Sequence, residues 1–168
     1  SHTILPDSEI TIEINPGTTG SQQLVDFRKI GINRINIGVQ SFQSAPLHFL
    51  GRIHSKNAAY QAIQWAREAG FENLGIDLMY GLPDQTKKSW LWDLQEAVGS
   101  EPEHLSCYML TYADGTPLDR QKRKGMVSPM DEGYLADLFE TTITFLQANG
   151  FALYEISNFE RIDPMGKI

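Results

Sequence analysis

The chain has 168 residues, of which 41% are hydrophobic and 21% charged, and its formal net charge is −7. This length is enough for one domain with a hydrophobic core, and the acidic charge argues against a general nucleic-acid-binding surface. A single cysteine, Cys107, excludes an internal disulfide, and neither an apolar run long enough to span a membrane nor a basic and apolar leader is visible. We therefore expect a cytoplasmic protein with one domain over residues 1–168 and no membrane span.

Alternating strand-like and helix-like segments predict an α/β fold. The first strand, residues 9–14, alternates polar and apolar side chains and ends at the turn Asn15-Pro16-Gly17. Residues 73–83 combine a buried strand with a tight turn at Gly81-Leu82-Pro83, because proline donates no hydrogen bond to a sheet. The other expected strands are residues 35–40, 104–111 and 153–156, and residues 41–52 and 112–126 are expected to be loops.

Four helices are expected between these strands, each with a helix-starting residue. Thr18 or Thr19 caps the first helix, Ser55 the second and Thr86 the third, and the last begins at Ser128-Pro129. Apolar residues at helical spacing mark the inward faces of the four helices: Leu24, Phe27 and Ile30; Ala59, Ala62, Ile63 and Ala66; Trp90, Leu91, Leu94, Ala97 and Val98; and Leu135, Leu138, Phe139, Thr142 and Leu146.

Three of the helices end in a glycine followed by an apolar residue, at Gly31-Ile32, Gly70-Phe71 and Gly150-Phe151. The spacing indicates a βα unit repeated about every 40 residues, and repeated βα units form a parallel sheet. Five strands are too few to close an eight-stranded barrel. We therefore expect part of a (β/α) barrel, or an open arc of one, with parallel strands and outer helices.

Polar residues stand where the predicted strands end. Glu13, Gln40, Asp77 and Thr111 fall at the C-terminal ends of four strands, and Arg52 lies in the loop after the second. An ionised carboxylate in an apolar strand, such as Asp77, is costly unless it is paired or hydrogen-bonded. Together these groups could bind the ammonium and carboxylate of an amino acid and a ribose diol. Alternatively, the two carboxylates pair with Arg52 or cap helices.

Other polar side chains give weaker indications. His48, His54 and His104 lack metal-ligand spacing and are expected at the surface or in loops, so no metal site is predicted. Cys107 lies in mid-strand and is more typical of a small core residue than of a nucleophile. The basic segment 120–124 is expected to be a solvated loop, although over the rim it could meet an acidic ligand. No phosphate loop or Ser-His-Asp arrangement is visible, and no residue is assigned as catalytic.

Five segments occur in a characteristic order: Ile12-Glu13-Ile14-Asn15-Pro16, Gly38-Val39-Gln40-Ser41-Phe42, Leu50-Gly51-Arg52-Ile53-His54, residues 75–83 and residues 154–159. Together they span nearly the whole chain and closely resemble the radical S-adenosylmethionine enzymes of the oxygen-independent coproporphyrinogen III oxidase group. Within that group, the second and third segments and residues 111–117 look more like the HemW-type haem chaperones than the true oxidases.

The resemblance implies a partial (β/α) barrel with S-adenosylmethionine lying across its C-terminal rim. By motif match, Glu13 would contact the ammonium of the methionyl group or neighbouring polar atoms. Gln40 and Arg52 would contact its carboxylate end, and Asp77 the ribose hydroxyls. Thr111 would pass close to the adenosyl group through its backbone. These are the same residues that stand at the predicted strand ends, which strengthens the interpretation as a cofactor site.

The chain also departs from the family pattern. Members carry a Cys-x3-Cys-x2-Cys motif whose thiolates bind a [4Fe-4S] cluster, and one cysteine cannot replace it. The Gly-Gly-Thr segment of an early family strand and the His-Asn-x-x-Tyr-Trp pattern expected after Phe159 are also absent. We therefore expect the middle of a longer protein, without its N-terminal cluster-binding units and C-terminal domain, and no radical chemistry from this chain alone.

The resemblance implies the cofactor-binding part of a HemW-like haem chaperone, with S-adenosylmethionine and haem as ligands and the cluster elsewhere in the full-length protein. Three alternatives remain open. The first is an oxidase that decarboxylates coproporphyrinogen III, and the second is a haem carrier whose radical machinery is vestigial. The third is a small-molecule-binding α/β domain without a cluster. The sequence assigns no haem ligand.

Overall fold

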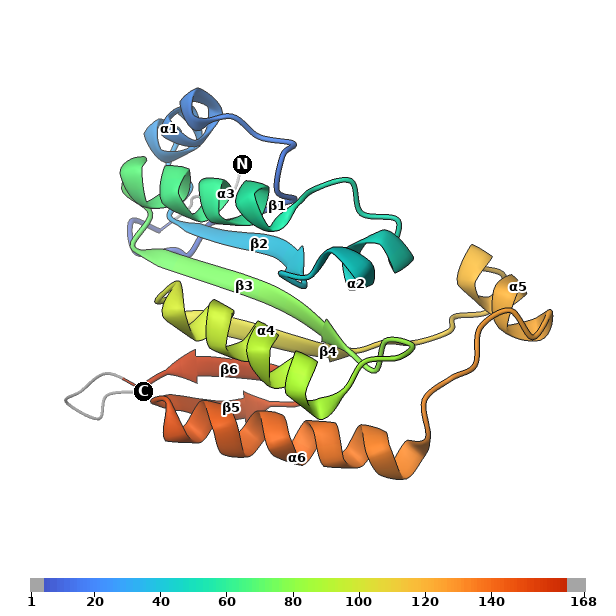
Figure 1. The fold of residues 1–168 in the computed structure, drawn as a ribbon. Coiled ribbons are helices and arrows are strands. Elements are labelled where there is room, and N and C mark those ends of the chain that lie inside the picture. The colour runs from blue at the N-terminus through green and yellow to red at the C-terminus, as the bar shows by residue number, and fades with distance from the viewer. Residues whose placement is uncertain (1–4, 163–168) are drawn as a thin grey trace.

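A six-stranded sheet forms the centre of the computed structural model, which describes residues 5–162 (Figure 1). Its strands lie in the order β1-β2-β3-β4-β6-β5. The end of the chain, whose sequence departs from the family pattern, lies outside the described residues from position 163 onward. The strands are β1 (Thr11–Ile14), β2 (Arg34–Gln40), β3 (Asn73–Tyr80), β4 (His104–Met109), β5 (Phe151–Glu155) and β6 (Asn158–Arg161). The helices are α1 (Ser21–Lys29), α2 (Ser44–Phe49), α3 (Lys56–Glu68), α4 (Lys87–Gly99), α5 (Pro117–Arg123) and α6 (Glu132–Ala148).

The first four strands are parallel neighbours in chain order, which confirms the predicted α/β fold with repeated βα units. Helices α1, α3, α4 and α6 connect successive strands and cover one face of the sheet, as outer helices of a barrel do (Figure 1). The sheet does not close within residues 5–162, because β1 and β5 are its two edges. The result is an open arc of a barrel whose parallel strands share one C-terminal rim.

The end of the sheet differs from the prediction. A strand was expected at residues 153–156, but β5 begins at Phe151 and is followed by β6, which the sequence pattern did not indicate. β6 pairs antiparallel with both β4 and β5 and lies between them. Ser157 makes the reversal possible with a φ of 72°, and its carbonyl accepts a hydrogen bond from the amide of Cys107 (2.8 Å). A short hairpin therefore replaces a fifth parallel strand.

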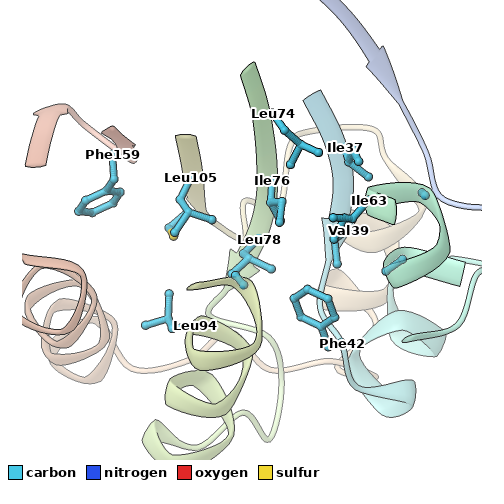
Figure 2. Packing of buried hydrophobic residues seen from close by; sticks show 14 of the residues in the cluster. Ile37, Val39, Phe42, Ile63, Leu74, Ile76, Leu78, Leu94, Leu105 and Phe159 are labelled. Atoms are coloured by element: carbon cyan, nitrogen blue, oxygen red, sulfur yellow. The ribbon is translucent and has the colours of Figure 1, made fainter. Parts of the chain in front are cut away.

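The hydrophobic core lies between the sheet and the covering helices (Figure 2). Alternate residues of each central strand point to it, as in Ile37 of β2, Ile76 of β3 and Leu105 of β4, all with no exposed surface. Trp90 of α4 is also fully buried, and its indole N–H donates to Thr142 of α6 (2.8 Å), which joins two helices. The predictions that Cys107 and Trp90 are core residues are confirmed.

Two predicted helix starts are wrong. The first helix begins after Gly20, whose N–H donates to the Gln23 side chain (2.9 Å), while the Thr18 hydroxyl donates to the Asn15 carbonyl (2.7 Å) and shapes the preceding turn. The last helix begins at Glu132, because the Asp131 carboxylate accepts from the amide of Tyr134 (3.1 Å). Ile30, expected on an inward face, follows the end of α1 and is 75% exposed.

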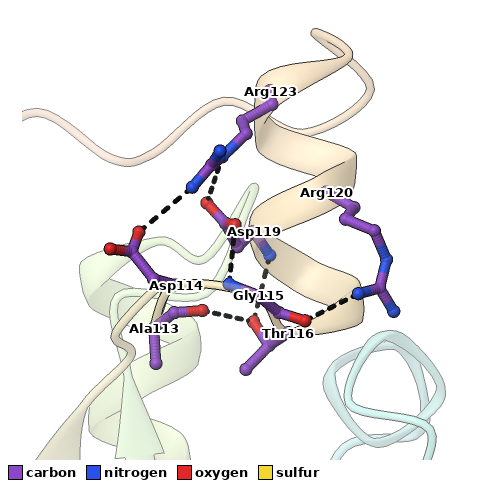
Figure 3. A network of polar contacts seen from close by, with 7 residues as sticks. All are labelled: Ala113, Asp114, Gly115, Thr116, Asp119, Arg120 and Arg123. Carbon is purple, nitrogen blue, oxygen red and sulfur yellow. Dashed lines mark hydrogen bonds and ion pairs between the residues drawn. The ribbon is translucent and has the colours of Figure 1, made fainter.

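Both predicted loops contain a short helix. Residues 41–52 include α2, and residues 112–126 include α5, which stands away from the sheet beyond the C-terminal rim (Figure 1). A polar network fixes the start of α5 (Figure 3). Thr116 accepts from the amide of Asp119 (3.2 Å), and Asp119 accepts from the amide of Gly115 (3.0 Å) and from Arg123 (3.0 Å). Much of the basic segment 120–124 is thus helical.

None of the helices in residues 5–162 is both long and apolar enough to cross a bilayer.

Candidate functional site

A polar cavity of about 330 Å³ lies where β1, β2 and β3 end. Glu13, Gln40, Arg52 and Asp77 line it together, so four of the five predicted site residues share one cavity. Its remaining lining residues are Ile14, Asn15 and Gly38. A larger cavity of about 520 Å³ near α2 has only Asp84 as an ionisable lining residue, with Phe49, Pro83 and residues 126–130, and offers less chemistry.

Thr111 lies apart from this group. β4 ends at Met109, so Thr111 is two residues beyond the strand rather than at its last position. Its side chain is exposed and does not line the cavity. Three of the four predicted strand-end residues therefore share the cavity with Arg52, and the fourth, Thr111, lies on the chain leading out toward α5.

A bulge in β2 brings Gln40 into the cavity. Ile37 pairs with Ile76 of β3, but Gln40 rather than Val39 pairs with Leu78, so β2 carries one extra residue. Gln40 adopts a φ of 66°, a left-handed conformation that is uncommon for any residue except glycine. Such a conformation costs about 1–3 kcal/mol and persists only where the surroundings enforce it, often at functional sites.

Gly38 provides the space that these side chains use. A Cβ atom at this position would lie 3.0 Å from Oδ1 of Asn15 and 3.1 Å from Nε2 of Gln40. Both side chains therefore fold over the bare backbone of β2. A side chain at this position would therefore force the Asn15 and Gln40 side chains to shift.

Arg52 enters the cavity from the loop after α2 and donates to Oδ1 of Asn15 (2.6 Å). Within residues 5–162 it forms no ion pair with Glu13 or Asp77. The alternative in which the two carboxylates merely neutralise Arg52 is therefore not the arrangement in the structure. The guanidinium stays next to the cavity with donors available for a carboxylate.

Asp77 is an acid of the cavity whose pKa is shifted by its surroundings. Burial raises the pKa of its carboxyl group and the nearby charge of Glu13 raises it further, while the hydrogen bond from Asn36 and the nearby Ser106 hydroxyl act in the opposite direction. Oδ2 accepts from Nδ2 of Asn36 (2.6 Å), whereas Oδ1 is enclosed and has no partner among the described residues. A buried carboxylate oxygen without a donor is unfavourable. Asp77 also lines the cavity, where a carboxylate can accept hydrogen bonds from hydroxyl groups.

Asn36 and Gly75 support Asp77 and were missed by the sequence analysis. A Cβ at Gly75 would lie only 2.3 Å from Oδ1 of Asn36, so the glycine makes room for the amide that orients the carboxylate. The alternation of Arg34 and Asn36 with the buried Ile35 and Ile37 could have revealed a polar face of β2. A rule that considers only strand ends does not include Asn36, which lies in the middle of β2.

The histidine prediction needs correction. His48 is exposed on α2 and His54 lies in the loop before α3, as expected, although the His54 side chain is buried there. His104 is buried within β4, so the prediction is wrong for this residue. The ring of His54 bonds the Val39 carbonyl (3.0 Å), and burial lowers the pKa of its imidazole. Burial lowers the pKa of His104 to about 4, and its Nε2 contacts the hydroxyl of Tyr154 (2.8 Å). Both rings are packed parts of the fold.

The donor set suits an amino acid and a ribose better than a metal cluster. Carboxylate, amide and guanidinium groups converge in the cavity, whereas Cys107 is 1% exposed, lies in β4 among core residues, and is the only cysteine of the chain. Burial also raises the pKa of its thiol far above the usual range. Within residues 5–162, no group of three His, Cys, Asp or Glu residues is arranged to hold a metal ion. An iron–sulfur cluster therefore does not fit the residues of this chain.

Residues 2–97 match the Radical SAM superfamily, and this is more than half of the chain. The chain therefore belongs to the radical SAM superfamily.

Named relatives narrow the comparison. The chain is 41% identical over 155 residues to the heme chaperone HemW of Escherichia coli (strain K12), covering 92% of this chain and 40% of that protein. It is 39% identical over 155 residues to the mitochondrial radical S-adenosyl methionine domain-containing protein 1 of Mus musculus, covering 92% of this chain and 35% of the relative. The chain thus spans about 40% or less of the length of these relatives.

Solved structures agree with the fold. The coproporphyrinogen III oxidase HemN of Escherichia coli, described as a radical SAM enzyme, superimposes with a TM-score of 0.82 at 29% identity, over 94% of this chain and 36% of that one. The archaeal Elp3 of Methanocaldococcus infernus superimposes with a TM-score of 0.68 at 22% identity, over 84% of this chain and 32% of that one, and supports the fold alone.

Proposed function

We propose that this chain forms the S-adenosylmethionine-binding part of a radical SAM protein of haem metabolism, similar in role to the heme chaperone HemW. The observation that carries the proposal is the convergence of Glu13, Gln40, Arg52 and Asp77 on one cavity at the C-terminal rim. Ligands of α/β proteins with parallel strands bind at this rim. The names of the relatives support the assignment to haem metabolism.

Each side chain has a chemical task in this proposal. Glu13 accepts from the ammonium of the methionyl group, and Arg52 donates to its carboxylate, with the Gln40 amide beside it. Asp77, whose carboxylate lines the cavity, accepts from the ribose hydroxyls. Thr111 would approach the adenosyl group from the chain leading to α5. All five residues bind and orient the cofactor, and none is proposed to be catalytic.

A [4Fe-4S] cluster held elsewhere in the full-length protein would supply the reducing electron, and its thiolate ligands would have to come from outside the residues of this chain. In this proposal, the chain binds and orients S-adenosylmethionine and provides a polar environment for it. Haem or coproporphyrinogen III remains the proposed second ligand of the whole protein, without assigned contacts here.

An oxidase function is the second candidate, because the oxidase HemN gives a close structural superposition. Anaerobic incubation of a cluster-loaded protein that contains this segment, with S-adenosylmethionine, a reductant and coproporphyrinogen III, separates the two. Loss of two carboxyl groups from the porphyrin would make the protein an oxidase. An unchanged porphyrin, with cofactor bound, would favour the chaperone role.

Equilibrium dialysis of the chain against labelled S-adenosylmethionine tests the binding proposal directly. Binding without the cluster is expected to be weak, so the titration should extend into the millimolar range. We expect Asp77→Asn and Gln40→Ala each to weaken binding, and the exposed control Asp26→Asn to leave it unchanged. Equal affinity of the original chain and the three variants would overturn the assignment. Absence of any S-adenosylmethionine binding by the original chain would also overturn it and would favour a non-catalytic domain with another ligand.

A further inference from the structure

Asp93 is a fully buried acid that lines none of the cavity described above. It lies on α4, and its carboxylate accepts three hydrogen bonds from the segment that follows β2. Its partners are the hydroxyl of Ser41 (2.8 Å), the amide of Phe42 (2.8 Å) and the side-chain amide of Gln43 (2.9 Å). A buried carboxylate is costly, so three donors directed at one group indicate a defined task.

The three partners directly follow the strained residue Gln40. The amide of Ser41 donates to the Val39 carbonyl (2.8 Å), which closes a tight turn around Gln40, and the Ser41 hydroxyl accepts from the amide of Gln43 (3.0 Å). Asp93 thus fixes the three residues that directly follow Gln40, whose φ is 66°. The left-handed conformation is enforced by these contacts rather than by a glycine.

We propose that Asp93 is a positioning residue of the cofactor site, which fixes the segment after β2 so that the Gln40 amide stays over Gly38 in the cavity. The inference rests on the proposed function and deepens it. Asp93 itself touches no ligand and acts through Gln40. Its chemistry requires an ionised carboxylate, because all three partners donate and only a carboxylate offers two acceptor oxygens. The positive charge of Lys56 nearby favours that ionised form, although burial raises the pKa of Asp93.

Asp93→Asn tests this role with almost no change of volume. The amide keeps one acceptor oxygen but presents N–H groups to donors, so the segment after β2 should loosen and Gln40 should leave its left-handed conformation. NMR of the free chain reports this directly, because a residue with positive φ gives a strong intraresidue HN–Hα cross-peak. We expect that cross-peak to weaken in Asp93→Asn and to persist in the exposed control Asp26→Asn. An unchanged Gln40 signal would refute the positioning role, whether or not the chain binds S-adenosylmethionine.

A double-mutant cycle tests the path through Gln40. In the original background, Asp93→Asn should weaken S-adenosylmethionine binding roughly tenfold. In a Gln40→Ala background it should weaken binding no further, because the group it positions is gone. An equal effect in both backgrounds would mean a general structural role. If Asp93→Asn fails to fold, Gln43→Ala removes one donor only and should show the same pattern with a smaller amplitude.

Failure of the proposed function is a separate outcome. If the original chain binds no S-adenosylmethionine but the Gln40 cross-peak is lost in Asp93→Asn, the link between Asp93 and Gln40 stands and the identity of the ligand is wrong. If the chain binds and Asp93→Asn leaves both affinity and cross-peak unchanged, the ligand is right and the positioning role is wrong.

Discussion

Replacing Gly75 by alanine perturbs the support of Asp77 without touching any residue of the cavity. The new Cβ would lie 2.3 Å from Oδ1 of Asn36, so the Asn36 side chain must move and its hydrogen bond to Asp77 (2.6 Å) must break. A hydrogen bond to a charged group contributes about 1.5–3 kcal/mol, and alanine in place of a strand glycine returns about 0.5–1 kcal/mol of backbone entropy. We expect a net loss of about 1–2 kcal/mol in the free energy of unfolding.

Urea denaturation followed by circular dichroism measures this loss. Gly99→Ala is the matched control, because a Cβ at Gly99 meets no atom within 4 Å, and it should be as stable as the original chain or slightly more so. Asn36→Ala should remove the penalty, so that Gly75→Ala is no longer destabilising in that background. Equal stability of Gly75→Ala and Gly99→Ala would refute the role assigned to Asn36 and Gly75.

Three further predictions follow from the same contacts. Burial raises the pKa of Asp77, so its ionised carboxylate is unfavourable in the folded state at a pH above that pKa. In urea titrations near neutral pH, Asp77→Asn should therefore be at least as stable as the original chain, although it should lose cofactor affinity. A lower stability of Asp77→Asn would contradict this prediction. Trp90→Phe removes the hydrogen bond to Thr142 and leaves a small cavity, so it should lose about 1–3 kcal/mol in the same assay, and an unchanged midpoint would contradict the packing described. His104 has a folded pKa of about 4 against an ordinary value of 6.5, so its contribution to stability is fully present above 6.5 and is lost as the pH falls toward 4; an NMR titration of its ring with a midpoint near 6.5 would contradict its burial.

The sequence predicted the parallel part of the fold because its signals are local. Strong apolar periodicity and the glycine after its last turn indicate α3. Ser55 and Thr86 cap α3 and α4 as expected. β6 was not predicted because it has only four residues and forms through its pairing with β4 and β5, which a local sequence pattern does not reveal. α2 and α5 escaped because six or seven residues carry too little periodicity to stand out from a loop.

The candidate site was predictable where one geometric rule applied. Parallel strands end at one rim, which brought Glu13 and Gln40 together. Asp77 was also expected at a strand end, but β3 continues to Tyr80, so Asp77 lines the cavity from within the strand. The rule could not reveal the bulge and the left-handed backbone of Gln40, because these depend on contacts made by Asp93 from a helix about 50 residues away. Thr111 fell outside the cavity because β4 ends two residues earlier than the apolar pattern indicated.

NMR mapping of S-adenosylmethionine on the isotope-labelled chain tests the central proposal most directly. If the cavity at the rim is the cofactor site, the amide signals of Glu13, Gln40, Arg52 and Asp77 should shift together during the titration, and Asp77→Asn should reduce the shifts at all four positions. Signals that stay fixed at the rim, or that shift instead around the larger cavity beside α2, would show that these residues do not form the binding site.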